Sequence, residues 1–484
     1  MTLFIKRNAP AVGLLALGLA SCQPEIEAPA ASAGSANFSS YVAVGNSLTS
    51  GYSDGGLYNE SQATSYPALL AQQFAKTGNG PANFVQPAFS AAKKDGSGYI
   101  KLLLVNGALT PVQPTPPPSP TNPNGNSFLG EAVAFTGNAL PGSGLPELEA
   151  YTGAQPDNLG VPGISVLSAD KTASATGSAP LDGATRGAAA AYGIINNFYQ
   201  RILPAADRGT KDYVTYISQK TATFFTCWMG NNDVLTYAAN GGVSSLATNP
   251  FSGMTDTTSF GRGYRNIVST ISKNGTVSGV CANIPNVTTI PYFTTVPVAA
   301  VIAGIKANPA SPNAAAASLY ITTGTGVVRE ATAADLLTLT ARAVIGTPST
   351  TPGNPFPVGV GYSATQANPL PSQFVLDATE VTAVVTRTNL LNAIIAKTAR
   401  QNKVALVDMN AFFNSIVQQG VVTNAVNNTV AFASGNLFAL DGVHFTPRGY
   451  AVIANEFIRI INTNYGASVP TMNPNNYRGV VFPQ

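Results

Sequence analysis

Residues 41–52 read YVAVGNSLTSGY, and this stretch decides the fold. The apolar run YVAV at 41–44 is typical of a buried strand, and Gly45 ends it. Ser47 follows at the start of a tight turn, and the carboxyl end of a strand is where an open α/β sheet presents a nucleophile. The same serine could be only a turn residue. A catalytic role therefore requires a base, an orienting acid and oxyanion donors from elsewhere in the chain.

Composition limits the kind of protein this is. The chain has 484 residues, is 45% hydrophobic and carries only 10% charged residues, well below the ~25% of ordinary soluble proteins. A net charge of +3, spread along the chain, does not indicate a nucleic-acid partner. His444 is the single histidine, which excludes a metal centre built on several histidines. Any mechanism that uses an imidazole must use His444.

The first residues predict export. Residues 1–21 combine Lys6 and Arg7 with a short apolar run at 9–20, as a signal peptide does. That run is too short to span a bilayer of ~30 Å. It ends in LASC at 19–22, which resembles the lipobox of bacterial lipoproteins and predicts lipidation of Cys22 as the mature N-terminus. Gln23 after it favours the outer membrane over the inner one. An ordinary signal peptide with a chance cysteine is the alternative.

The remaining chain is expected to form one folded domain. Residues 22–37 are rich in Ala, Pro, Ser and Glu and predict a flexible tether. The domain is expected over 38–465, with insertions near 100–157 and 294–372 and a C-terminal tail at 466–484. The second insertion reads as irregular, with one helix around 331–341.

Strand and helix patterns alternate about five times along the domain. Strands are predicted at 41–44, 158–165, 221–228, 275–284 and 404–407, and helices at 64–76, 187–203, 260–271, 376–402, 411–419 and 447–461. This order predicts an α/β fold with an open, mostly parallel sheet and helices on both faces. Cys227 and Cys281 lie within two of these strands and are expected to be buried free thiols, although an envelope location would allow a disulfide.

Two further segments carry candidate chemistry. Asp441 and His444 lie three residues apart in a turn before a helix, so the carboxylate can bond one ring nitrogen while the other faces outward. Asn232 follows the strand at 221–228, and its amide could donate to an oxyanion. The alternative for Asn232 is a cap on a helix at 234–239, for which Asp233 is the better candidate.

Four short segments together resemble the sequence blocks of the SGNH hydrolases, also called GDSL-type esterases and lipases. GNSL at 45–48 resembles the nucleophile block, and Gly163 matches the glycine of the second block. GNND at 230–233 and DGVH at 441–444 match the third and last blocks. One departure is Asn46, where the family usually has aspartate.

The resemblance implies a three-layer α/β/α fold of flavodoxin-like type and ester hydrolysis without a metal or other cofactor. It implies that Ser47 is the nucleophile, His444 the base, and Asp441 the residue that orients it. The backbone N–H groups of Ser47 and Gly163 and the side chain of Asn232 would form the oxyanion hole.

Three functions follow as hypotheses. The leading one is a serine esterase of the bacterial envelope, held at the membrane through lipidated Cys22. A carbohydrate O-deacetylase of the same fold is the second. The third is a surface lipoprotein that binds glycan or protein without catalysis, for which Asn46 and the large insertions are the support.

Overall fold

The computed structural model describes residues 30–112, 132–139, 146–170, 196–244, 252–308 and 313–483. The predicted signal peptide and Cys22 lie outside the described residues, as does most of the helix predicted at 187–203. In the described end of that segment, α8 covers only Asn197–Gln200.

A five-stranded parallel sheet forms the centre of the molecule. Its strands are β1 (Tyr41–Gly45), β6 (Asn158–Gly160), β7 (Phe224–Trp228), β8 (Ser278–Ala282) and β15 (Ala405–Val407). Their spatial order is β15-β8-β7-β1-β6, and all four pairings are parallel. Counted along the chain this is the order 2-1-3-4-5 of flavodoxin-like folds. The predicted fold class is confirmed.

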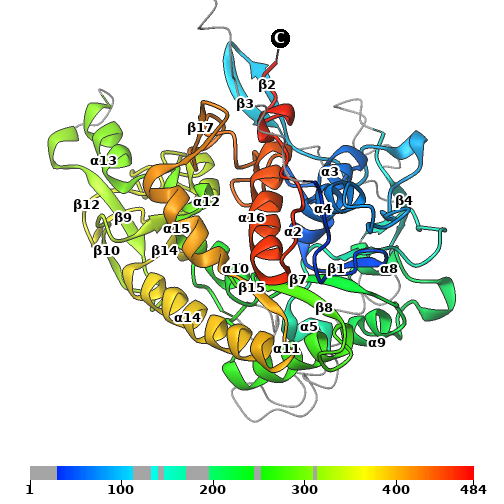
Figure 1. Ribbon diagram of the computed structural model, residues 1–484. Helices are drawn as coiled ribbons and strands as arrows, with labels where there is room; N and C mark the ends of the chain where they lie inside the picture. Colours follow the sequence, from blue (N-terminus) through cyan, green and yellow to red (C-terminus); the bar gives the residue numbers. More distant parts are fainter. Residues whose placement is uncertain are drawn as a thin grey trace, which may run out of the picture.

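Helices cover both faces of the sheet (Figure 1). On one face α4 (Tyr66–Ala75) packs against α16 (Pro447–Tyr465), where the rings of Tyr66 and Phe457 stack at 4.7 Å. The other face carries α5 (Val166–Ala169), α9 (Tyr213–Ser218), α11 (Thr257–Ile271) and α14 (Ala378–Gln401). Trp228 of β7 points toward the first face, with its ring 5.7 Å from that of Tyr66.

The two cysteines are direct neighbours across the sheet. Cys227 of β7 is the register partner of Cys281 of β8. Both are fully buried and free, which confirms the expectation of unbonded thiols.

The predicted tether boundary at residue 38 is wrong for the part of the segment that the structure describes. The Ser35 N–H donates to the carbonyl of Tyr465 at 2.8 Å, and the Ser468 N–H donates to the carbonyl of Ser32 at 2.9 Å. Ala33 and Ala36 are buried. Small residues mimic a linker in composition, but here they fit closely against the end of α16, and the folded region includes residues 30–37.

The second insertion is an ordered unit with its own apolar core. It contains α13 (Val298–Ala307) and an antiparallel sheet of β10 (Val328–Glu330), β9 (Ser318–Thr322), β12 (Val360–Ser363) and β13 (Gln366–Ala367). The helix predicted at 331–341 is wrong. Residues Leu336–Leu337 form β11, which pairs with β14 (Val375–Leu376), and a 3-10 helix follows at Leu339–Ala343. Leu337 belongs to the core of the insertion, so its partners come from distant residues rather than from its own helical turn.

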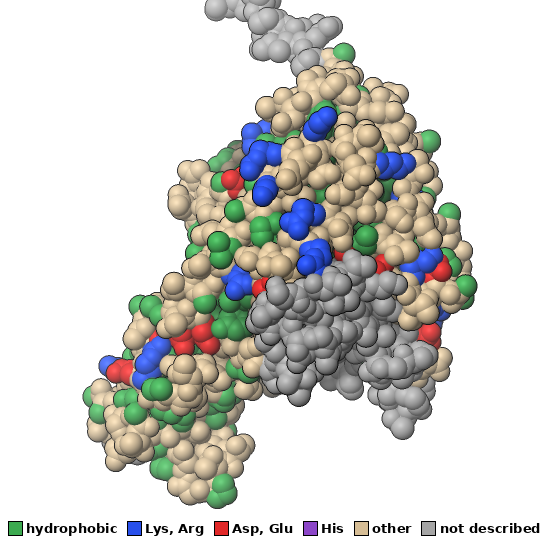
Figure 2. Space-filling model, turned by 90° about the horizontal axis from the view of Figure 1, so that it is seen from below, with side chains coloured by type: hydrophobic (Ala, Val, Ile, Leu, Met, Phe, Trp, Pro, Cys, Tyr) green, Lys and Arg blue, Asp and Glu red, His purple; other side chains and the backbone are tan. Residues whose placement is uncertain are grey.

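Shorter elements complete the described chain. They are α2 (Ser47–Ser50), α3 (Asn59–Ala63), α10 (Asn232–Ala239), α12 (Pro291–Thr294), α15 (Met409–Gln419) and the hairpins β2–β3 (Lys101–Val105, Ala108–Val112), β4–β5 (Phe135–Ala139, Pro146–Leu148) and β16–β17 (Val421–Thr423, Val426–Asn428). None of the described helices combines the length and the apolar character that crossing a bilayer requires. Figure 2 shows one face on which lysines and arginines are separated by uncharged groups, in line with the low content of charged residues.

Candidate active site

The turn after β1 fixes the position of Ser47. Gly45 ends the strand where α2 crosses close above it, and a Cβ at Gly45 would lie only 1.9 Å from Thr49 Oγ1. Asn46 is the N-cap of α2, and its Oδ1 accepts the Leu48 N–H at 3.1 Å. Ser47 is therefore the first residue of a short helix at the carboxyl edge of the sheet, where its side chain is held at the surface of the core.

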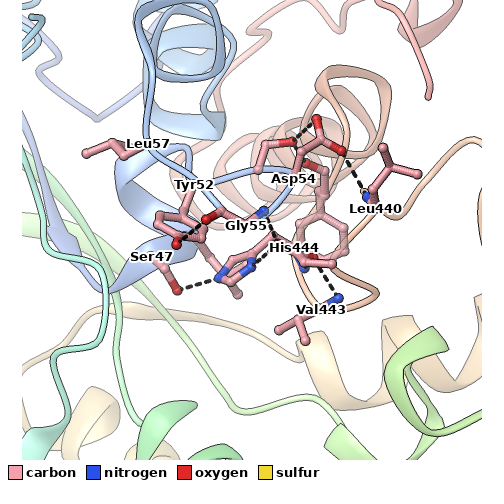
Figure 3. Close-up of polar contacts among 12 residues, drawn as sticks. Ser47, Tyr52, Asp54, Gly55, Leu57, Leu440, Val443 and His444 are labelled. Atoms are coloured by element: carbon pink, nitrogen blue, oxygen red, sulfur yellow. Dashed lines mark hydrogen bonds and ion pairs between the residues drawn. The ribbon is translucent and has the colours of Figure 1, made fainter. Parts of the chain in front are cut away.

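Ser47, His444 and Asp441 form one hydrogen-bonded row (Figure 3). His444 Nε2 lies 2.8 Å from Ser47 Oγ, and His444 Nδ1 lies 2.8 Å from Asp441 Oδ2. The other carboxylate oxygen of Asp441 accepts the backbone N–H groups of Val443 and His444, both at 2.8 Å. The structure thus brings Ser47 next to His444 and Asp441, although Ser47 and His444 are 397 positions apart in the sequence.

The charge on Asp441 is well stabilised. Burial raises the pKa of this carboxyl, but the attraction of His444 and the hydrogen bonds from His444 and Val443 outweigh it and lower the pKa to about 2. Asp441 therefore stays ionised through the neutral range. A fixed negative charge at Nδ1 selects the tautomer in which Nε2 accepts a proton from Ser47.

Sequence reasoning missed the loop that holds Asp441 in place. The Gly55 N–H donates to Asp441 Oδ2 at 2.8 Å, and Asp54 Oδ1 accepts the Leu440 N–H at 2.9 Å (Figure 3). Asp54 adopts a φ of 52°, and the Asp-Gly pair marks a turn in the sequence. The turn is therefore visible in the sequence, but its partners 386 residues away are not.

The predicted oxyanion donors line one pocket with the serine. Gly163, in the turn after β6, and Asn232, in the first turn of α10, border the same cavity of about 340 Å³ as Ser47 and His444. Gly163 has a φ of +80°, which favours glycine. Among the described residues, no group accepts the backbone N–H of Ser47 or of Gly163.

Asn232 is held beside this turn. Its Nδ2 donates one N–H to the carbonyl of Ile164 at 2.8 Å, and the second N–H has no partner in the described part of the chain. Three donors without a partner in the described chain thus belong to residues that line the cavity beside Ser47, as an oxyanion hole would require.

Asp233 does not cap its own helix, contrary to the sequence-based expectation. The N-cap of α10 is Asn231, and Asp233 accepts instead from the N–H groups of Val166 and Leu167 and from Thr255 Oγ1, at 2.8, 3.3 and 2.7 Å. Burial raises the pKa of Asp233 to about 6, although these hydrogen bonds by themselves lower it. Asp233 ties the start of α5, just after the Gly163 turn, to α10.

Asn46 stabilises the turn before Ser47 with a neutral amide in place of the expected carboxylate. Its side chain is fully buried, and its Nδ2 donates to Asn231 Oδ1 at 3.1 Å. A carboxylate could accept from Leu48 as Asn46 does, but it could not donate to Asn231. The amide is therefore matched to its neighbour on the loop after β7.

Metal ligands do not gather at this site or elsewhere in the described chain. No group of three or more His, Cys, Asp or Glu side chains among the described residues is placed to hold a metal ion.

Comparison with known proteins gives one match. A family model described as GDSL-like Lipase/Acylhydrolase matches residues 137–457. This range includes Gly163, Asn232, Asp441 and His444 and begins after Ser47. No curated protein and no solved structure matches the chain significantly.

Proposed function

Because the chain belongs to the family of GDSL-like lipases and acylhydrolases, which hydrolyse esters, we propose that it is a serine esterase acting through Ser47. The hydrogen-bonded row from Ser47 through His444 to Asp441 is the observation that carries this proposal. Ser47 lies outside the matched residues, so its role rests on this geometry and on the GNSL segment.

In the proposed mechanism Ser47 Oγ attacks the ester carbonyl carbon while His444 Nε2 accepts its proton. The carbonyl oxygen becomes an oxyanion that accepts hydrogen bonds from the Ser47 and Gly163 N–H groups and from Asn232. His444 then gives the proton to the departing alcohol. A water molecule repeats the sequence on the acyl-serine, releasing the acid and restoring Ser47.

The proposed location is the bacterial envelope. Residues 1–21 have the features of a signal peptide, and LASC at 19–22 supports lipid attachment at Cys22 and a membrane partner. Expression with an alkyne-labelled fatty acid tests this. The full chain should incorporate label into the membrane fraction, and the Cys22→Ala variant should not. Equal labelling of both would contradict lipidation at Cys22.

Hydrolysis of p-nitrophenyl acetate tests the catalytic assignment. Ser47→Ala and His444→Ala should each lower kcat by about 10⁴-fold or more, because the residues act as a unit. Ser39→Ala, which changes an exposed serine, is the matched control and should keep full activity. If wild type and Ser47→Ala release acyl groups equally from simple esters and acetylated sugars, the protein is a binding lipoprotein instead.

A further inference from the structure

Two cavities of very different size meet at the nucleophile. The larger is the pocket of about 340 Å³ that contains the oxyanion donors, and the smaller holds about 30 Å³. Ser47, Asn232, Leu235 and His444 border both. The two cavities offer separate places for the acyl part and the alcohol part of an ester bound at Ser47.

The small cavity has apolar and closely packed walls. Besides the four shared residues it is lined mainly by Leu48, Pro285, Val287, Ile290, Phe413, Phe438, Val443 and Phe445. Phe413 stacks on Phe445 at 5.3 Å, and Phe438 lies 5.1 Å from Phe445. These rings are part of the main core, so the cavity cannot widen without disturbing it. A volume of about 30 Å³ corresponds to about two water molecules.

The large cavity has a different chemistry. Its walls include the amides of Asn197 and Asn232 and the rings of Tyr52 and Phe198, which meet edge to face at 5.9 Å. Within the described residues, Asn197 Nδ2 makes one hydrogen bond, a long one of 3.4 Å to the carbonyl of Pro146. Amides and aromatic faces together suit a ligand with hydroxyl groups on an apolar ring.

We propose that the site is selective for acetyl esters of carbohydrates, with the acetyl methyl group in the small cavity and the sugar in the large one. This deepens the proposed function and rests on it. Ser47 Oγ forms a bond to the acetyl carbon, the bond from that carbon to the sugar oxygen breaks, and the sugar hydroxyl leaves with the proton from His444. Water then converts acetyl-Ser47 to acetate.

The acyl side is tested with p-nitrophenyl acetate, butyrate and octanoate. For the wild type, kcat/KM should fall by about 10-fold or more from acetate to butyrate and further to octanoate, since a single methylene changes discrimination by about 10- to 200-fold. Ile290→Ala widens the small cavity and should raise the ratio of butyrate to acetate hydrolysis by about 10-fold. Val287→Ala should also raise the ratio of butyrate to acetate hydrolysis, and it replaces Ile290→Ala as the test if that variant folds poorly.

A matched control separates this effect from general loosening. Ile302→Ala removes the same atoms from a partly buried residue of α13 that packs against the separate core of the insertion, and it should leave the chain-length profile unchanged. A wild-type profile that is flat, or that favours octanoate, overturns the acetyl assignment while the proposed function stands. Failure of the wild type to hydrolyse any of the three esters overturns the proposed function itself.

The alcohol side is tested with Asn197→Ala. Acetate release from 6-O-acetylglucose, which keeps free hydroxyl groups, should fall by about 10-fold in kcat/KM because the sugar loses a polar partner. Asn79→Ala is the matched control, because Asn79 is exposed, lies outside both cavities and likewise makes a long contact of 3.4 Å to a backbone carbonyl, that of Ala36. Equal kcat/KM values for Asn197→Ala and Asn79→Ala on this sugar ester would overturn the placement of the carbohydrate in the large cavity.

Discussion

At the scale of single residues, Asn46 is the most informative position. The resemblance to the nucleophile block leads one to expect an aspartate there, and the structure gives the amide a partner, Asn231 Oδ1, to which a carboxylate could not donate. Asn46 both accepts from the Leu48 N–H and donates to Asn231 Oδ1. The missing charge is thus no argument against catalysis, because the side chain still braces the turn that carries Ser47.

We expect Asn46→Asp to destabilise the protein by about 2 kcal/mol, since a carboxylate would be buried opposite Asn231 Oδ1. Asn37→Asp is the matched control. Asn37 is exposed, and its Oδ1 also accepts an N–H two residues ahead, from Ser39 at 3.0 Å. Urea unfolding of both variants at pH 7 measures the difference. Equal stability of the two would show that the Asn231 contact contributes nothing.

Asp441 should contribute to stability in a defined pH range. Its pKa in the folded protein is lowered to about 2, so its contribution is full above the unfolded value and is lost as the pH falls from about 4 to 2. The shift corresponds to about 2–3 kcal/mol. Unfolding free energies of wild type and Asp441→Asn should converge over this range. Parallel curves for the two proteins would contradict the lowered pKa.

At the scale of elements, the site is assembled where β1 and β7 lie side by side and their following helices, α2 and α10, diverge. This is the crevice at which open α/β sheets bind ligands. The turn that contains Gly163 also borders the site. Asp233 links this turn to α10 by accepting hydrogen bonds from the first N–H groups of α5. We propose that Asp233 is a positioning residue, because these bonds tie the segment that follows Gly163 to the helix that carries Asn232.

Asp233→Ala should therefore lower kcat by about 10- to 100-fold with a smaller change in KM, since displaced oxyanion donors act mainly in the transition state. Asp256→Ala is the control, because Asp256 bonds the first N–H groups of α11 in the same way, outside the cavities at Ser47. That variant should lose about 1 kcal/mol of stability and keep its kcat. Similar kcat values for the two variants would remove the positioning role of Asp233.

The elements also show what could be predicted from sequence. Ser47, Asn232 and the pair Asp441 and His444 each follow a local signal, either a strand end or a three-residue spacing. Asp233 and Asp54 could not be assigned, because their partners lie 67 and 386 residues away. Strand length does not explain why the sheet of the second insertion was missed, since the predicted central strands are also short. Its strands lie in a segment rich in Ala, Thr, Pro and Gly, without the alternation of strand and helix patterns that indicates the central sheet.

At the scale of the whole molecule, the N-terminal segment at residues 30–37 packs against the C-terminal end of α16 and is held there by hydrogen bonds. We expect a chain that starts at Phe38 to be less stable than one that starts at Ala30 by about 1–3 kcal/mol, because it exposes the surface under Ala33 and Ala36 and loses two backbone hydrogen bonds. Thermal unfolding of the two chains measures this. Identical midpoints would mean that residues 30–37 only rest on the surface.

Helix α16 connects the N-terminal segment at residues 30–37 with the candidate active site. Helix α16 begins three residues after His444 and ends at Tyr465, where the N-terminal segment is bound, and its 19 residues span about 28 Å. The Ser47 cavity, which His444 lines, and the contact of residues 32–35 thus lie near opposite ends of α16. Under the proposed attachment at Cys22, the Ser47 cavity would lie at the end of this long helix that is remote from residue 30, where the described part of the chain begins.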